Sequence, residues 1–178
     1  MRETNDNRGV TLVELIIAVT IVVILATVLN FTFQGWMGRY NVESQIRQIY
    51  GDMMEARVEA LQRKRVYFVR FPTATSYEIY EDDNPGPDGN GTLETAADRR
   101  LAGFPKTVAY PLIWAGGNIT FDSRGMVTVQ NPPNITLQVN TTVVADYDCL
   151  RLSPLVSPLG IYSSFSLGKW DGSACVIK

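Results

Sequence analysis

The sequence of 178 residues contains no histidine and only two cysteines. Without histidine, the chain cannot form a Ser-His-Asp triad, a Cys-His pair or a His-ligated metal site. It also lacks a large charge excess, because 16 basic and 18 acidic residues leave a net charge of -2. A general nucleic-acid binder needs a strong positive field, so any polyanion site would be local. We therefore expect no enzyme, with carboxylate-only chemistry as the catalytic option left open, and a structural or binding role instead.

The two cysteines, Cys149 and Cys175, lie late in the chain and fit no C-x-x-C redox or zinc pattern. If this part of the chain lies outside the cytoplasm, a disulfide between them is expected. It would stabilise the fold by roughly 3 kcal/mol through loop-closure entropy. Two buried free thiols are the alternative that the spacing leaves open.

Charge is also missing from one long segment, because no charged residue occurs from Leu15 to Gly38. A membrane-spanning helix needs about 20 apolar residues, so the run is long enough to span a bilayer. A cleaved secretory signal has only about 7–15 apolar residues and a small-residue cleavage site, for which Ala26-Thr27-Val28 is a poor substitute. A plain signal anchor is the other alternative, but it leaves Glu14 unexplained. A carboxylate inside lipid costs on the order of 2.5–3.5 kcal/mol and by default marks a functional site.

The residues around Glu14 form a recognisable motif. A short polar leader, residues 1–9, ends in Gly9 and is followed by Val10-Thr11-Leu12-Val13-Glu14 and the apolar run. This pattern resembles the type IV prepilin signal. The resemblance implies that a prepilin peptidase cuts between Gly9 and Val10 on the cytoplasmic side and that the new N-terminus, Val10, is methylated. Val10 departs from the phenylalanine that is usual at this position.

The resemblance makes Glu14 the fifth residue of the mature chain. Cleavage would create a positive amine at Val10, one helical turn from the carboxylate, and an acid near a helix N-terminus is also favoured by the helix dipole. In a filament of packed helices, Glu14 would pair with the Val10 amine of a neighbouring subunit and set the assembly register. A snorkelling acid without a partner is the alternative.

The pattern becomes amphipathic after Arg39. We predict one long helix over residues 10–63, whose first half spans the membrane and whose second half packs on a globular head. The cluster Arg63-Lys64-Arg65 closes it, either as cations at a helix C-terminus or as a polyanion site. The apolar face of the second half consists of Val42, Ile46, Ile49, Met53 and Ala60.

The rest of the chain contains short runs with strand patterns, beginning with the hairpin VYFVRF and SYEIYE. The expected fold class is α+β, with the helix packed on an antiparallel β head of two sheets. The domains would be a leader (1–9), a transmembrane and filament-core helix (10–38) and a head (39–178). Further strands are expected at 108–114, 118–121, 126–129, 134–139, 149–152, 162–167 and 174–177.

Two further stretches, MMEARVEALQRKRVYFV and NITFDSRG, are similar to the GspH/FimT-like minor pseudopilins and minor pilins. The resemblance implies a structural subunit at or near the tip of a type II secretion pseudopilus or a type IV pilus. Its partners would be other major and minor pilins, the prepilin peptidase and the inner-membrane assembly platform. The chain would cross the bacterial inner membrane once, with its head in the periplasm, before it enters the filament.

A tip binding module for DNA or a secretion substrate is the alternative function. Some family members use a glycine-arginine signature for DNA, but here Gly160 is followed by Ile161, with only Lys169 nearby, so DNA binding is not expected. No cofactor is expected either, although one loop contains oxygen ligands of the kind that calcium prefers. A solvated turn-rich loop is the competing interpretation. The candidate ligands are Asp82, Asp83, Asp88, Asn90 and Glu94.

Overall fold

The computed structural model describes residues 10–86, 89–129, 135–157 and 160–178. Side chains are not described at 28–34, 129, 135, 153–157 and 160–163. The cleavage residue Gly9, the candidate ligand Asp88 and part of the predicted membrane span therefore lie outside the described positions. The chain divides into two compact units, Met1–Gly38 and Arg39–Lys178.

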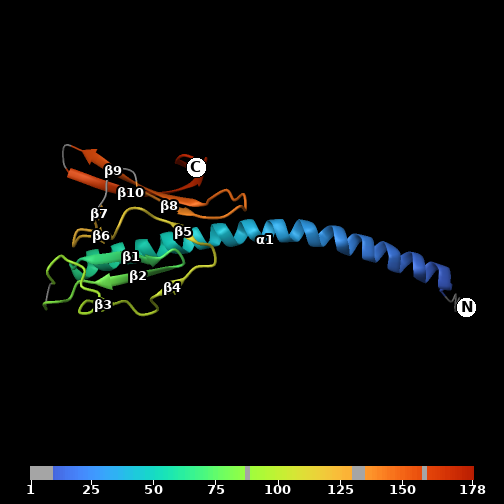
Figure 1. The fold of residues 1–178 in the computed structure, drawn as a ribbon, viewed down its shortest axis with the longest axis horizontal. Helices are drawn as coiled ribbons and strands as arrows, with labels where there is room; N and C mark the ends of the chain where they lie inside the picture. Colours follow the sequence, from blue (N-terminus) through green and yellow to red (C-terminus); the bar gives the residue numbers. More distant parts are fainter. Residues whose placement is uncertain (1–9, 87–88, 130–134, 158–159) are drawn as a thin grey trace, which may run out of the picture. The chain divides into compact units, whose positions relative to one another are not determined.

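A single helix, α1 (Leu12–Arg63), runs through the first unit and into the second, in agreement with the predicted range of 10–63. Figure 1 shows its N-terminal half in blue. Large apolar side chains of this half, from Val10 to Leu25, are exposed in the isolated chain. Taking the described residues alone, no helix is both long enough and apolar enough to cross a membrane.

The C-terminal half of α1 forms one wall of the head's core. The residues predicted for its apolar face are fully buried, and each large aliphatic side chain removed from water contributes roughly 1.5–3 kcal/mol. The side chains that meet them come from both sheets, including Val69 and Ile79 from one and Leu137 and Leu150 from the other. The helix is therefore held by a core that both sheets share.

The first sheet has the strand order β3-β2-β1-β6-β7, and β4 also pairs with β2. The predicted hairpin is confirmed, with Thr73 opposite Ser76 at its turn. The short β3 and β4, both on the open side of β2, were not predicted. The bounds are β1 (Tyr67–Thr73), β2 (Ser76–Glu81), β3 (Arg99–Arg100), β4 (Lys106–Thr107), β6 (Ile119–Phe121) and β7 (Val127–Val129).

The second sheet has the order β11-β10-β9-β8-β5. Figure 1 shows its long β9–β10 hairpin in orange and red. The strand predicted over 108–114 is wrong in extent, because only Leu112–Ile113, near its C-terminal end, pair as β5, and the preceding Pro111 lacks the N–H that a ladder requires. The bounds are β5 (Leu112–Ile113), β8 (Ile135–Val139), β9 (Cys149–Ser157), β10 (Gly160–Trp170) and β11 (Cys175–Ile177).

Cys149 and Cys175 form a disulfide with a Cα–Cα distance of 6.0 Å. The bond joins β9 to β11 across the intervening strand β10, at the level of Gly168. Gly168 pairs with Cys149 on one side and with Ile177 on the other. A Cβ atom there would lie 2.9 Å from the Cys175 Sγ and 2.4 Å from the Val176 carbonyl oxygen. Glycine is needed because the disulfide and the neighbouring backbone occupy the space of a side chain.

Candidate functional site

The N-terminal motif starts the helix. The Glu14 backbone N–H donates to the Thr11 Oγ1 at 3.3 Å, and the Leu15 N–H donates to the Thr11 carbonyl at 3.1 Å. Thr11 is thus the N-cap, and Glu14 stands three residues later, at the position where an acid is also favoured by the helix dipole. The helix therefore begins two residues after Val10, which leaves the predicted cleavage point just outside it.

Glu14 lies on a concave apolar strip of α1. The hollow that this strip lines has a volume of about 480 Å³. Among the described residues that line it, Glu14 has the only ionisable side chain, and Val10 at its start is 70% exposed. The Thr20 hydroxyl, farther along the same unit, donates to the Ile16 carbonyl at 2.7 Å, so it does not need an outside partner. The strip is lined by Val10, Glu14, Leu15, Ala18, Val19, Val22 and Val23.

The two head stretches that carried the family resemblance meet in space. Arg57, from the helix stretch, donates from Nε to the Gly125 carbonyl oxygen at 2.8 Å. Gly125 closes the turn of residues 122–125, D-S-R-G, between β6 and β7, where its N–H donates to the Asp122 carbonyl at 2.8 Å. Its φ is +69°, and an added Cβ would lie 2.8 Å from the Leu61 Cγ. The turn is therefore clamped on the helix by both hydrogen bonding and close packing.

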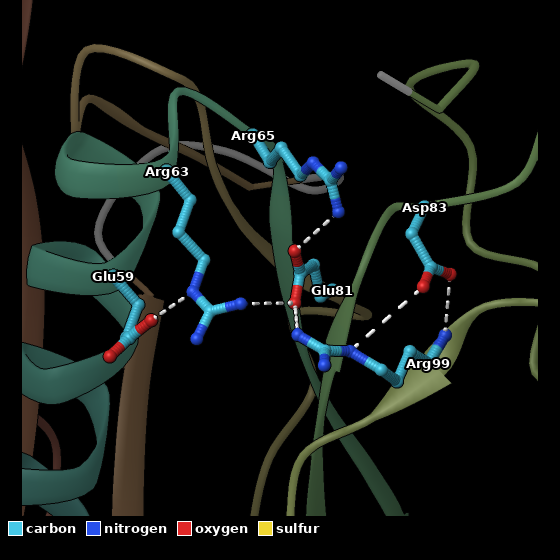
Figure 2. A network of polar contacts seen from close by, with 6 residues as sticks. All are labelled: Glu59, Arg63, Arg65, Glu81, Asp83 and Arg99. Carbon is cyan, nitrogen blue, oxygen red and sulfur yellow. Dashed lines mark hydrogen bonds and ion pairs between the residues drawn. The ribbon is translucent and has the colours of Figure 1, made fainter. Parts of the chain in front are cut away.

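Glu81 at the end of β2 is fully buried, and three arginines surround it (Figure 2). Arg65 donates from Nη1 to Glu81 Oε1 at 2.7 Å, and Arg99 donates to Oε2. Arg63 Nη1 lies 3.6 Å from Oε2 and its Nε donates to Glu59 at 2.6 Å. The basic cluster at the end of α1 thus holds a buried carboxylate, in addition to its place at a helix C-terminus.

Burial alone would raise the pKa of Glu81, but the hydrogen bonds from Arg99 and Arg65 and the positive charges nearby outweigh it. The net pKa lies below the usual 4.5, so the carboxylate is charged at neutral pH. The strand alternation contained a signal for this residue, because it places Glu81 on the same face as the apolar Tyr77 and Ile79.

Four of the five calcium candidates are among the described residues, and each has an oxygen that accepts a hydrogen bond from the protein itself; they are Asp82, Asp83, Asn90 and Glu94. Asp82 is fully buried, so the interpretation of this segment as a solvated loop does not hold for it. The Asp82 carboxylate accepts the N–H groups of Asn90 at 3.1 Å and Gly91 at 2.6 Å. The Glu94 carboxylate accepts the side-chain amides of Asn84 and Asn90, and Asp83 accepts the Arg99 N–H at 3.0 Å. Within the described ranges, no group of three or more ligating side chains is arranged to hold a metal.

Asp98 was not singled out in the sequence, yet it is only 7% exposed. Its Oδ2 accepts the Glu94 N–H at 2.6 Å, whereas its Oδ1 has no hydrogen-bond partner among the residues that the structure describes. Burial raises its pKa, and the negative charges of Asp82, Glu94 and Asp83 act in the same direction. No sequence pattern distinguishes this aspartate from the solvated ones.

The stretch around Lys169 also contains Phe165 and Trp170, whose rings are of the kind that stacks on bases. Phe165 is partly buried against the head's core, where it stacks on Phe121 with ring centroids 5.7 Å apart. The Trp170 backbone N–H donates to Asp148 at 2.6 Å. The side chains of Ile161 and Tyr162 lie outside the described positions.

A long helix with a capped, apolar N-terminal half, packed at its C-terminal half on an antiparallel β head, defines a pilin-like α+β protein. The comparisons agree with this class. The prokaryotic N-terminal methylation motif matches residues 4–30, and the family described as type II transport protein GspH matches residues 45–155, which is more than half of the chain. The chain therefore belongs to the GspH family. No curated protein and no solved structure matches it.

Proposed function

We propose that the chain is a minor pseudopilin or minor pilin that is cleaved after Gly9, methylated at Val10 and assembled at or near the tip of a filament. The observation that carries the proposal is the methylation motif at residues 4–30 joined to a GspH-family head. The role is structural, and the head supplies packing surfaces. A type II secretion pseudopilus is favoured over a type IV pilus because the family is a type II transport family.

Before assembly, residues 10–38 would anchor the chain in the bacterial inner membrane, with the head in the periplasm. The sequence supports this step, since no charge interrupts the run from Leu15 to Gly38. The disulfide between Cys149 and Cys175 also suits an oxidising compartment such as the periplasm. The prepilin peptidase and the assembly platform would be the membrane partners.

In the filament, the uncovered apolar strip around Glu14 would pack against the corresponding helices of neighbouring subunits. Glu14 is its only ionisable group, so an amine from a neighbouring Val10 would be its natural partner. An ion pair in such a low-dielectric bundle is strong when both partners are present and costly when one is missing. Glu14 would therefore specify which register of helices is allowed.

Deletion of the gene tests the proposed role. If the chain is a pseudopilin, filament-dependent secretion is lost and reintroduction of the intact gene restores it. Intact secretion and filaments with loss of DNA uptake alone would contradict this role and favour the tip binding module instead.

A further inference from the structure

The head contains a groove between the C-terminal half of α1 and the segment that carries β3 and β4. Its volume is about 690 Å³. One side is formed by Asp52, Glu55 and Glu59 of α1, and the other by residues 99–104 and Lys106. Apolar lining is supplied by Ala56 and Ile79, which are buried, and by Leu101 and Phe104, which are partly buried.

Arginine donors gather at one end of this groove. Arg63 and Arg99 both line it, and their side chains are 48% and 51% exposed, although both contact Glu81. Glu81 itself is fully buried, so an incoming molecule meets the guanidinium groups and not the carboxylate. Figure 2 shows the two groups converging on Glu81. A guanidinium has five N–H donors, and Arg63 and Arg99 each use only part of this set within the described residues.

The acidic side of the groove limits what can enter. Asp52 is paired with Lys106, whose Nζ lies 2.7 Å from Oδ2, and Glu59 is paired with Arg63. Glu55 is exposed on the same side. A nucleic-acid backbone would bring a row of phosphates against this side, which disfavours it. A single carboxylate at the arginine end avoids the acids and gains a bidentate, charge-assisted contact.

We propose that this groove binds an extended segment of another subunit of the same filament, in which an acidic residue lies close to an apolar one. The acid would bind Arg63 and Arg99, and the apolar side chain would pack on Leu101 and Phe104. The identity of the partner as a filament subunit rests on the proposed function. A second copy of this chain is a poor occupant, because the carboxylates of its own acidic loop, Asp82 among them, already accept internal hydrogen bonds.

Ala102 offers a matched pair of variants, because it lines the groove and is exposed. A102E and A102R add similar bulk with opposite charge. The proposal predicts that A102E weakens binding of the acidic segment about fivefold or more, whereas A102R preserves it. A109E is the control, since Ala109 is also exposed but does not line the groove.

The experiment uses the full chain in its host, with the photo-crosslinker p-benzoylphenylalanine in place of Glu55. The expected result is an adduct with another filament subunit, mapped by mass spectrometry. Its crosslinked segment should have an Asp or Glu within about three residues of an apolar side chain, roughly 10 Å of extended chain. A102E should lower the adduct yield, and A102R and A109E should not.

Several results would overturn the groove proposal: no adduct, an adduct with a second copy or with nucleic acid, a segment without an acid, or equal loss with A102E and A102R. Failure of the proposed function looks different, because the chain would then remain uncleaved or fail to co-purify with filaments.

Discussion

The Arg57 Nε donates a hydrogen bond to the Gly125 carbonyl oxygen at 2.8 Å, and this contact joins the helix to the β6–β7 turn. The two residues are 68 positions apart in the sequence. Leu61, one turn further along α1, packs so closely on Gly125 that a side chain there has no room. The position of the first sheet on the helix therefore depends on an arginine, a leucine and a glycine acting together.

Replacing Gly125 with alanine should destabilise the head by about 2–4 kcal/mol. The cost combines the positive φ of +69° with a Cβ placed 2.8 Å from the Leu61 Cγ. Urea unfolding of the full chain in detergent measures the change. Gly91→Ala is the matched control, because Gly91 has a φ of +78° and nothing within 4 Å of an added Cβ.

Gly91→Ala should lower the free energy of unfolding by only about 1 kcal/mol, because it introduces backbone strain alone. The double variant Gly125→Ala with Leu61→Ala should recover part of the loss relative to the sum of the single changes. Equal costs for the Gly125 and Gly91 variants would show that the packing against Leu61 does not matter.

Much of the head was predictable because its elements have clear periods. The buried face of α1, the β1–β2 hairpin and the DSRG turn all follow from local pattern, and the disulfide was one of the two options for Cys149 and Cys175. The strands β3 and β4 were missed because each has two residues, too few for any alternation to be visible. They form only because β2 offers an open edge to a segment that returns from far along the chain.

The buried carboxylate Glu81 shows why site residues are harder to predict. Its inward direction was encoded in the alternation of SYEIYE, but its partners come from the end of α1 (Arg63), the connection that follows it (Arg65) and β3 (Arg99). The cluster Arg63-Lys64-Arg65 is already explained as cations at a helix C-terminus, so no local pattern predicts a buried acid beside it. The burial of Asp98 and Asp82 likewise depends on how the loop folds, and no periodic pattern in the sequence predicts that.

Glu81→Gln should destabilise the head by about 2–4 kcal/mol at pH 7, because three arginines lose their shared buried anion. The folded-state pKa of Glu81 is below its usual 4.5, so its contribution is complete above about pH 4.5. The contribution is lost as the pH falls through the folded-state value. The difference between wild type and Glu81→Gln should therefore shrink on acidification.

Thermal unfolding of both proteins between pH 7 and pH 3 measures this difference. Arg47→Gln is a suitable control, because the exposed Arg47 forms an i,i+4 pair with Glu43 and a cation–π contact 5.2 Å from the centre of the Tyr147 ring. Loss of these two surface contacts should change stability by no more than about 1 kcal/mol. A difference that stays constant across the range would refute the role assigned to Glu81.

Replacing both cysteines with serine should cost about 3 kcal/mol, because the disulfide constrains the unfolded chain over a separation of 26 residues. The loss of stability should be greatest at β11, because this edge strand is joined to β9 by the disulfide. Hydrogen exchange should speed up at Cys175–Ile177, with the β1–β2 hairpin as the internal control. Unchanged protection of β11 would mean that its three-residue pairing with β10 is sufficient.

Glu14→Ala should leave cleavage and membrane insertion intact but lower incorporation into filaments about tenfold or more, since the Val10 amine of a neighbour would lose its partner in a low-dielectric bundle. Val13→Ala is the control, because Val13 is exposed but does not line the strip around Glu14. Quantitative immunoblotting of sheared filaments against the membrane fraction gives the ratio. Equal incorporation of the two variants would remove the pairing argument.

Intact-mass and N-terminal peptide mass spectrometry of the protein from its host tests the central claim most directly. The account predicts that the mature chain begins at Val10 and carries one added methyl group at its amine. A chain that still begins at Met1, or one that is cut near Ala26-Thr27-Val28, would contradict it.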